Sequence, residues 1–194
     1  MAKKVHGITT DTVKRFVIDS GAIYINYGVA GTERLLGATR GGNTFTIEQD
    51  IKVIEIDGTK GKMKGARRIV ESNATITANI LELTTANLMT AIAGSTSTTW
   101  TDTTSAPATN THDEIRRTRN LSDLDYITNI AIVGKVSGSA ENIICIIYNA
   151  LADEGFELAF EDRDEGALEV TFSAHYDPTT LDTEPWAIRY PKVV

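Results

Sequence analysis

Several features that define common protein classes are scarce in this chain. Its 194 residues include one cysteine and 7% aromatic residues. A single cysteine excludes an intrachain disulfide, and Cys145 lies in the apolar run of residues 143–148, where a small buried side chain is expected. The apolar runs are too short to span a membrane, and the lysines near the N-terminus precede polar residues instead of a signal-peptide core. We therefore expect a protein made in the cytoplasm, which leaves it only within a larger particle.

Motifs with the spacing of catalytic, metal or cofactor sites are also missing. His6, His112 and His175 lie far apart, and no HExxH or CxxC pattern accompanies them. No GxSxG elbow is present, and no nucleophile stands beside an obvious base. The glycines and lysines of residues 57–65 resemble a phosphate-binding loop, but the GxxxxGKS/T pattern is absent and the segment joins strand to strand. We expect no metal, no cofactor and no enzymatic activity.

Acidic residues crowd the stretch 153–169, which holds eight carboxylates and one arginine. A carboxylate-dependent hydrolase would need two acids held across a cleft, with Glu161 and Asp164 as candidates, but these acids fall within the turns of one segment. Asp162, Asp164 and Gly166 echo a calcium loop, yet the spacing to glycine is one residue short and no bidentate glutamate follows where it is needed. A solvated acidic surface is the better interpretation.

The charge of the chain is unevenly distributed. The net charge is −7, but residues 1–80 carry 12 Lys and Arg against 8 Asp and Glu, whereas residues 121–194 carry 4 against 14. An acidic total disfavours a nucleic-acid-binding module, which needs a basic footprint. A basic front half and an acidic back half suit head-to-tail association of identical subunits. A solvated surface without a partner is the alternative.

Short alternating segments indicate that the chain is mainly β. Strands are expected within residues 21–28, 126–138, 142–150, 156–162 and 167–177. One α-helix is expected at residues 84–94, capped by Thr84 or Thr85 and ended by Gly94. The low-complexity stretch 95–111 is expected to be a loop, with Trp100 packed back on the body.

The longest β feature is a hairpin within residues 35–83. Its second strand has one apolar face, formed by Ala74, Ile76, Ala78 and Ile80. In its first strand the apolar face is formed by Phe45, Ile47, Ile51 and Val53, and the shift to Ile54 and Ile56 predicts a β-bulge near Val53. A hairpin of this length exposes backbone edges, so its expected use is pairing with other copies of the chain.

The predicted fold is two packed antiparallel β-sheets, a sandwich or barrel, with one flanking α-helix. We expect a single domain of residues 1–194 with an N-terminal arm (residues 1–20) and a C-terminal arm (residues 178–194). The hairpin loop (residues 57–65) and the variable loop (residues 95–111) would project from it.

Residues 16–28, 35–48, 54–69 and 181–191 together resemble the major tail, or tail tube, proteins of siphoviruses that infect Gram-positive bacteria. The most specific combination is LLGATRGGN followed by EIDG and KGARR. The similarity spans nearly the whole chain except residues 95–111. It implies the tail-tube and secretion-tube fold, with six subunits in a ring and rings stacked head to tail into the hollow tail of a virion. Its implied partners are the chain itself, the tape-measure protein and the tail terminator and initiator proteins, while DNA passes through without specific binding.

The resemblance also implies roles for individual residues. Inter-ring stacking would fall to the hairpin loop and its base, namely Asp57, Lys60, Lys62, Lys64, Arg67 and Arg68. A lumen of negative potential would repel DNA phosphates and let the genome slide through. The candidate lumen-facing acids are Glu48, Asp50, Glu55 and Glu169.

A β-sandwich binding module, for a surface or a carbohydrate, is the alternative from another class. It would need a patch of exposed aromatic residues, for which Trp100 and Trp186 are the available tryptophans.

Overall fold

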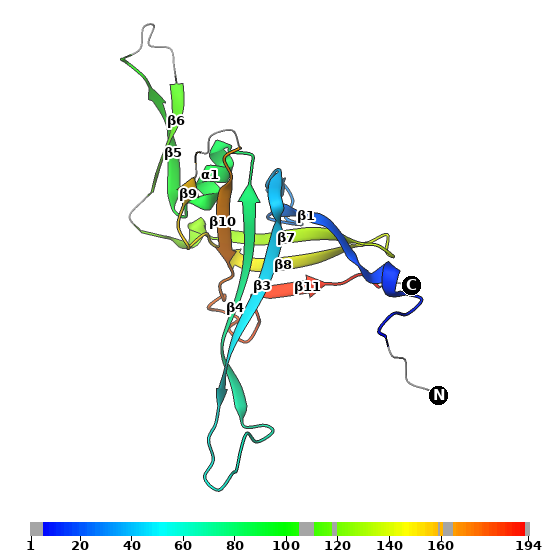
Figure 1. Ribbon diagram of the computed structural model, residues 1–194. Helices are drawn as coiled ribbons and strands as arrows, with labels where there is room; N and C mark the ends of the chain where they lie inside the picture. The colour runs from blue at the N-terminus through cyan, green and yellow to red at the C-terminus, as the bar shows by residue number, and fades with distance from the viewer. Residues whose placement is uncertain (1–5, 105–110, 118–119, 159, 161–164, 193–194) are drawn as a thin grey trace.

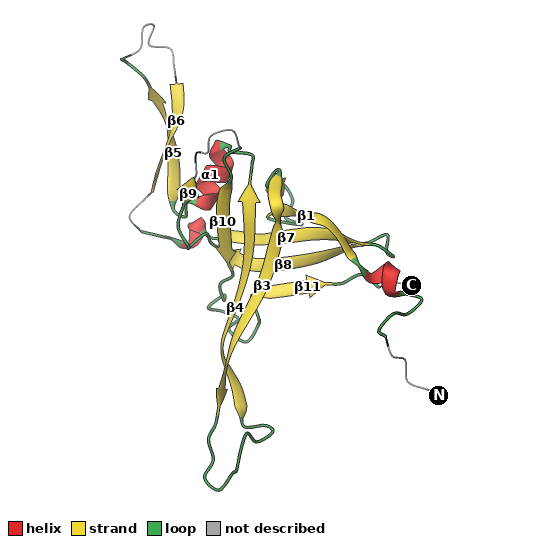
Figure 2. Ribbon diagram, in the orientation of Figure 1, coloured by secondary structure: helices red, strands yellow, loops and turns green. Residues whose placement is uncertain are grey.

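The computed structural model describes residues 6–104, 111–117, 120–158, 160 and 165–192. The described chain is mainly β, with packed antiparallel sheets and a single α-helix, as the sequence predicts. Figure 1 shows a central body from which two β-ribbons project in opposite directions. Figure 2 shows that strands form the layers of the body and the stems of both ribbons, while loops form the end of the lower ribbon.

One layer of the body is a five-stranded sheet in the order β11-β8-β7-β1-β2. Its strands are β1 (Val17–Ile25), β2 (Arg34–Leu35), β7 (Ile127–Val136), β8 (Asn142–Ala150) and β11 (Trp186–Arg189). All of its pairs are antiparallel. The expected strands within residues 126–138 and 142–150 are thus confirmed, because continuous apolar runs suit strands at the centre of a sheet.

The second layer is a four-stranded antiparallel sheet in the order β3-β4-β10-β9. Its strands are β3 (Thr39–Val53), β4 (Arg67–Ile80), β9 (Glu157–Leu158) and β10 (Leu168–Ser173). In Figure 1 these strands run across those of the first layer.

The hydrophobic core lies between the two layers. From β4 it receives Ala74, Ile76, Ala78 and Ile80, all buried, so the alternation read from the sequence is confirmed. Phe172 of β10 is also fully buried. The five-stranded layer contributes mainly isoleucines to this core: Ile23, Ile25, Ile130 and Ile147.

The α-helix α1 (Thr85–Ala91) lies within the predicted range but is shorter than predicted. Thr84 caps it, since the Thr84 side chain accepts a hydrogen bond from the backbone N–H of Asn87. Gly94 follows with a φ of 68°, a conformation that favours glycine and that ends the segment as expected.

The segment predicted as a variable loop is partly a β-ribbon, so this prediction is wrong in part. β5 (Ser95–Thr101) pairs with β6 (Thr111–Arg117) in a separate two-stranded sheet. Trp100 is 46% exposed and lies against the ring of His112, with 5.4 Å between ring centroids, instead of packing on the body. Threonine-rich strands with polar side chains on both faces give no apolar alternation, so the pattern concealed the strands.

The β3–β4 ribbon extends well beyond the body (Figure 1). Both strands are close to three times the usual strand length. The predicted bulge near Val53 is misplaced: Asp50 pairs with Glu71 and Ile51 with Ile69, so Val70 of β4 is the extra residue. The side chains of β3 keep their alternation through Val53, because the partner strand takes up the irregularity.

The two ends of the chain combine arm-like and sheet-forming segments. A short 3-10 helix, η1 (Thr12–Arg15), precedes β1, and β1 itself begins within the predicted N-terminal arm. β11 lies within the predicted C-terminal arm and forms the sheet edge beside β8. A second 3-10 helix, η2 (Asp123–Asp125), leads into β7.

Candidate assembly surfaces

The far end of the β3–β4 ribbon is a turn-rich loop of residues 54–66, called here the tip loop. A hydrogen bond from the backbone N–H of Ile54 to the carbonyl of Ala66, 2.9 Å long, closes its base. Thr59 donates from its backbone and hydroxyl to the carbonyl of Ile56, which closes a first turn, and Ala66 donates to Met63 in a second. The tip loop is therefore locally folded and borders an open hollow of about 580 Å³.

The residues predicted for stacking gather at this end of the molecule. Asp57, Lys60, Lys62 and Lys64 lie on the tip loop, and all four are exposed. Arg67 and Arg68 begin β4 opposite Val53 and Lys52. The structure thus brings the six predicted residues to one projecting element, where five positive charges and one negative charge face solvent.

Apolar side chains on the same ribbon are exposed as well, and sequence reasoning missed their significance. Six are exposed at or above 40%: Ile51, Ile54, Ile56, Met63, Ile69 and Val70. Ile69 and Val70, each 55% exposed, are adjacent in sequence, as the bulge allows. The polar Gln49, which interrupts the apolar alternation of β3, could have indicated this exposure, because it marks where the strand leaves the core.

Three of the four predicted lumen-facing acids share the outer face of the four-stranded sheet. Every second side chain of β4 points into the core, and the side chains between them point outward. Residues of β3 and β10 that pair with these outward positions share the same outer face of the sheet. Glu48 is opposite Asn73, Asp50 is opposite Glu71, and Glu169 is opposite Asn79, all on this outward set. Glu55 lies instead on the tip loop, so it is separate from the other three.

The outer face also holds two like-charged pairs that the sequence could not reveal. Asp50 lies directly opposite Glu71, and Glu169 lies directly opposite Glu157 of β9. Directly opposed like charges are destabilising in antiparallel sheets. The face therefore retains a concentration of negative charge at a cost in stability, between rows of threonine and asparagine.

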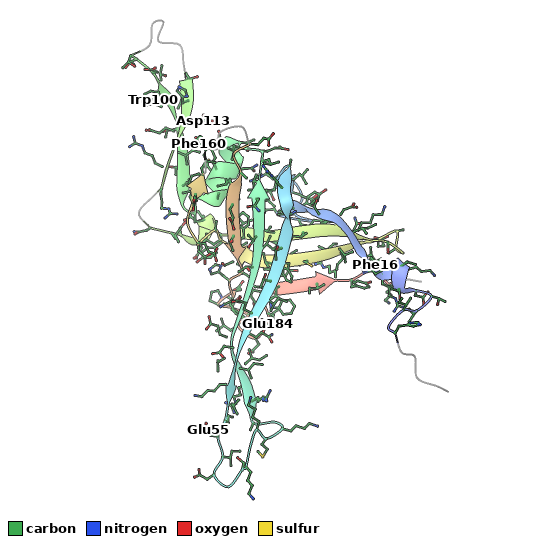
Figure 3. All side chains as sticks on the ribbon, in the orientation of Figure 1. Phe16, Glu55, Trp100, Asp113, Phe160 and Glu184 are labelled. Carbon is green, nitrogen blue, oxygen red and sulfur yellow. The ribbon has the colours of Figure 1, made fainter. Side chains whose placement is uncertain are left out.

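Sheet edges are open at several places in the described chain. β3 is an edge strand along its whole length, and β2 covers only Tyr24 and Ile25 of β1. The N-terminal segment and the start of β1 expose large apolar side chains: Ile8, Val13, Phe16, Val17 and Ile18. Figure 3 shows Phe16 at the side of the body, away from both ribbons. Unpaired backbone groups beside exposed apolar side chains are typical of surfaces that join other chains.

The two tryptophans do not form one aromatic platform. Trp100 lies on the β5–β6 ribbon, while Trp186 is half-buried against the core in β11 and donates from Nε1 to Glu184, 3.1 Å away. Figure 3 shows Trp100 and Glu184 at distant parts of the molecule. This separation disfavours a carbohydrate-binding patch built from both rings.

A hollow of about 460 Å³ lies beside the end of β10. It includes His175, whose Nδ1 lies 3.1 Å from the carbonyl oxygens of both Asn149 and Ser173. Tyr126 contacts the same ring edge to face. Hydrogen bonds from Thr179 lower the pKa of Asp177 at the rim. None of the residues lining this hollow is a serine, threonine or cysteine nucleophile.

The remaining sequence candidates give no catalytic constellation. Glu161, Asp162 and Asp164 lie outside the described residues, and Asp153 accepts a hydrogen bond from Ser173. Within the described residues, no group of three or more His, Cys, Asp or Glu side chains is placed to hold a metal ion. Cys145 is half-buried rather than fully buried, and desolvation raises the pKa of its thiol.

No protein-family model matches this chain, and no curated protein sequence matches it. In the part of the chain that the structure describes, no helix is long and apolar enough to cross a membrane.

Proposed function

We propose that this protein is a structural subunit of a phage tail tube, which assembles into six-membered rings stacked head to tail around a channel for DNA. The observation that carries the proposal is the β3–β4 ribbon. It leaves the body with six large apolar side chains exposed and with a cluster of lysines and arginines at its end. An isolated monomer gains nothing from such an element, whereas a repeating assembly buries it in the next subunit.

The acidic outer face of the four-stranded sheet supports the same function. Glu48, Asp50, Glu71, Glu157 and Glu169 share it, and two of their pairings cost stability. A channel lined by such a face repels phosphates, so DNA moves through it without adhering. The open edge of β3 gives this sheet a place to continue into a neighbouring subunit.

Deletion of residues 59–64 tests the proposal. Negative-stain microscopy of the concentrated, purified protein should show tubes with a central channel. The deletion variant should keep its circular dichroism spectrum and melting temperature, because the tip loop contributes little core, but it should form no tubes. A matched control shortens an exposed loop elsewhere, by replacing residues 179–182, before β11, with a two-residue turn.

Two results would overturn the proposal. One is an unmodified protein that remains monomeric at high concentration, both alone and with tail initiator proteins. The other is a deletion variant that polymerises as the unmodified protein does, which would remove the tip loop from the assembly mechanism.

A further inference from the structure

Exposed apolar side chains form patches at two opposite ends of the subunit. One patch is the tip loop and its flanking strands, which include Ile54, Ile56 and Met63. The other surrounds α1 and includes Leu124, 94% exposed, and Phe160, 91% exposed. Figure 1 shows α1 at the end of the body away from the tip loop, and Figure 3 shows Phe160 near that end. Two different patches at opposite ends are what a head-to-tail interface requires.

A groove between α1 and η2 lies within the second patch and has a volume of about 380 Å³. Its lining is mostly apolar and comes from both helices, from β7 and from the end of β8; it includes Ala86, Met89, Ala93, Leu124, Ile127 and Leu151. Leu124 stands at its rim with almost its whole side chain in solvent.

The carboxylates of η2, beside the groove, are opposite in charge to the lysines of the tip loop. Asp123 and Asp125 flank Leu124, and Asp125 is held in place by accepting hydrogen bonds from the backbone and hydroxyl of Ser122. Arg34, which also lines the groove, is engaged by Asn87 Oδ1 at 2.8 Å and Thr90 Oγ1 at 2.6 Å. Asp125 itself lines the groove, whereas Asp123, on the other side of Leu124, lines the neighbouring hollow beside β10.

We infer that the groove between α1 and η2 is the acceptor for the tip loop of a second copy of this chain. Met63 and the neighbouring isoleucines enter the groove against Leu124, and the tip-loop lysines face Asp125. This assignment rests on the proposed tube function, and it adds the partner surface that the tip loop contacts. Because the two patches lie at opposite ends of the subunit, copies joined through them follow one another head to tail.

Cross-linking between positions 63 and 124 tests the contact directly. In a Cys145→Ala background, one preparation carries Met63→Cys and another carries Leu124→Cys, and the two are mixed under assembly conditions with a short bis-maleimide. We expect a mixed dimer from this pair, and a ladder of multimers when one chain carries both cysteines. Leu181→Cys replaces Leu124→Cys as the control, because Leu181 is another exposed leucine, in the loop before β11.

Substitutions in the groove give an independent measurement. Leu124→Ser should raise the concentration needed for tube formation about tenfold, since the burial of one leucine is lost at every interface. Ala86→Trp fills the groove from an exposed helix position and should block elongation. Leu181→Ser should leave the assembly concentration unchanged, and thermal melting checks that all three variants fold.

The outcomes separate the two proposals. Tubes that form normally with Leu124→Ser and Ala86→Trp, without a 63–124 cross-link, would overturn the groove assignment and leave the tube function standing. Equal cross-linking of positions 124 and 181 to position 63 would also overturn it. Unmodified protein that forms no tubes would overturn the tube function itself.

Discussion

The side chain of Asn87 connects α1 to the body through three hydrogen bonds, and no sequence motif predicted this role. This side chain is 2% exposed; it donates to the carbonyls of Leu36 and Glu82, at 2.7 and 2.9 Å, and accepts from Arg34. Burial lowers the pKa of Arg34, so this guanidinium depends on its polar partners. A helix of seven residues is marginal alone, so these contacts hold it in place.

We predict that Asn87→Ala destabilises the protein by about 2–3 kcal/mol, because it leaves buried carbonyl groups and an arginine without their partners. Urea unfolding followed by circular dichroism measures the change. Asn142→Ala, at an exposed position of β8, serves as the matched control and should stay within about 0.5 kcal/mol. Equal effects of the two substitutions would contradict the role assigned to Asn87.

The sequence predicted which residues are buried where a strand with a regular apolar alternation packs against the core. The alternation of β4 from Ala74 to Ile80 identified buried positions, because each second side chain of a strand faces the same way. The pattern could not identify Asn87 as buried, since its partners lie as far as 53 residues away in the chain. Glu71 and Glu157 were not predicted as members of the acidic face for the same reason. Only the pairing of the strands places Glu71 opposite Asp50 and Glu157 opposite Glu169.

At the level of the elements, the two like-charged pairs on the outer face allow a quantitative test. Replacement of Asp50 by threonine removes the repulsion with Glu71 and should stabilise the protein by about 0.2–1 kcal/mol at low salt. The gain should shrink as salt screens the pair. Glu48→Thr is the matched control, because it makes a similar change of side chain opposite the neutral Asn73.

Denaturant unfolding at low and high salt measures both variants. If Asp50→Thr is no more stabilising than Glu48→Thr at low salt, the cross-strand repulsion does not contribute. Threonine suits a strand at both positions, so the difference between the variants isolates the electrostatic part.

Among the elements, the hairpin was predictable and the β5–β6 ribbon was not. Strands β3 and β4 enter the core for part of their length, and that part leaves an apolar alternation in the sequence. The β5–β6 ribbon contacts the rest of the described chain mainly through α1, where Thr85 donates to Asp113 at 2.6 Å. Because this ribbon buries little apolar surface, its sequence lacks the alternation of apolar and polar residues on which strand prediction depends.

At the level of the whole molecule, reversal of the acidic face should change how the assembly treats DNA. We predict that tubes of Glu48→Lys, Asp50→Lys, Glu71→Lys protein retain DNA inside the channel at low salt and release it at high salt. The measurement is the amount of DNA that sediments with tubes after nuclease treatment, because an enclosed strand is protected.

The matched control carries the same change of charge at exposed acids elsewhere, through Glu141→Lys, Glu154→Lys and Asp182→Lys. DNA bound by these lysines should be digested, since it lies on accessible surface. Equal protection in both variants would place the acidic face outside the channel.

The shape of the ribbon has a consequence for the symmetry of an assembly. A two-stranded ribbon twists more strongly than a wide sheet, and the Val70 bulge adds to that twist before the tip loop is reached. The far end of the ribbon is thus rotated relative to its base. A copy bound at that end would be both displaced and turned, so successive layers would follow a screw to whose pitch the twist at the bulge contributes. Deletion of Val70 would then change the helical repeat of the filament while the body of each subunit stayed the same.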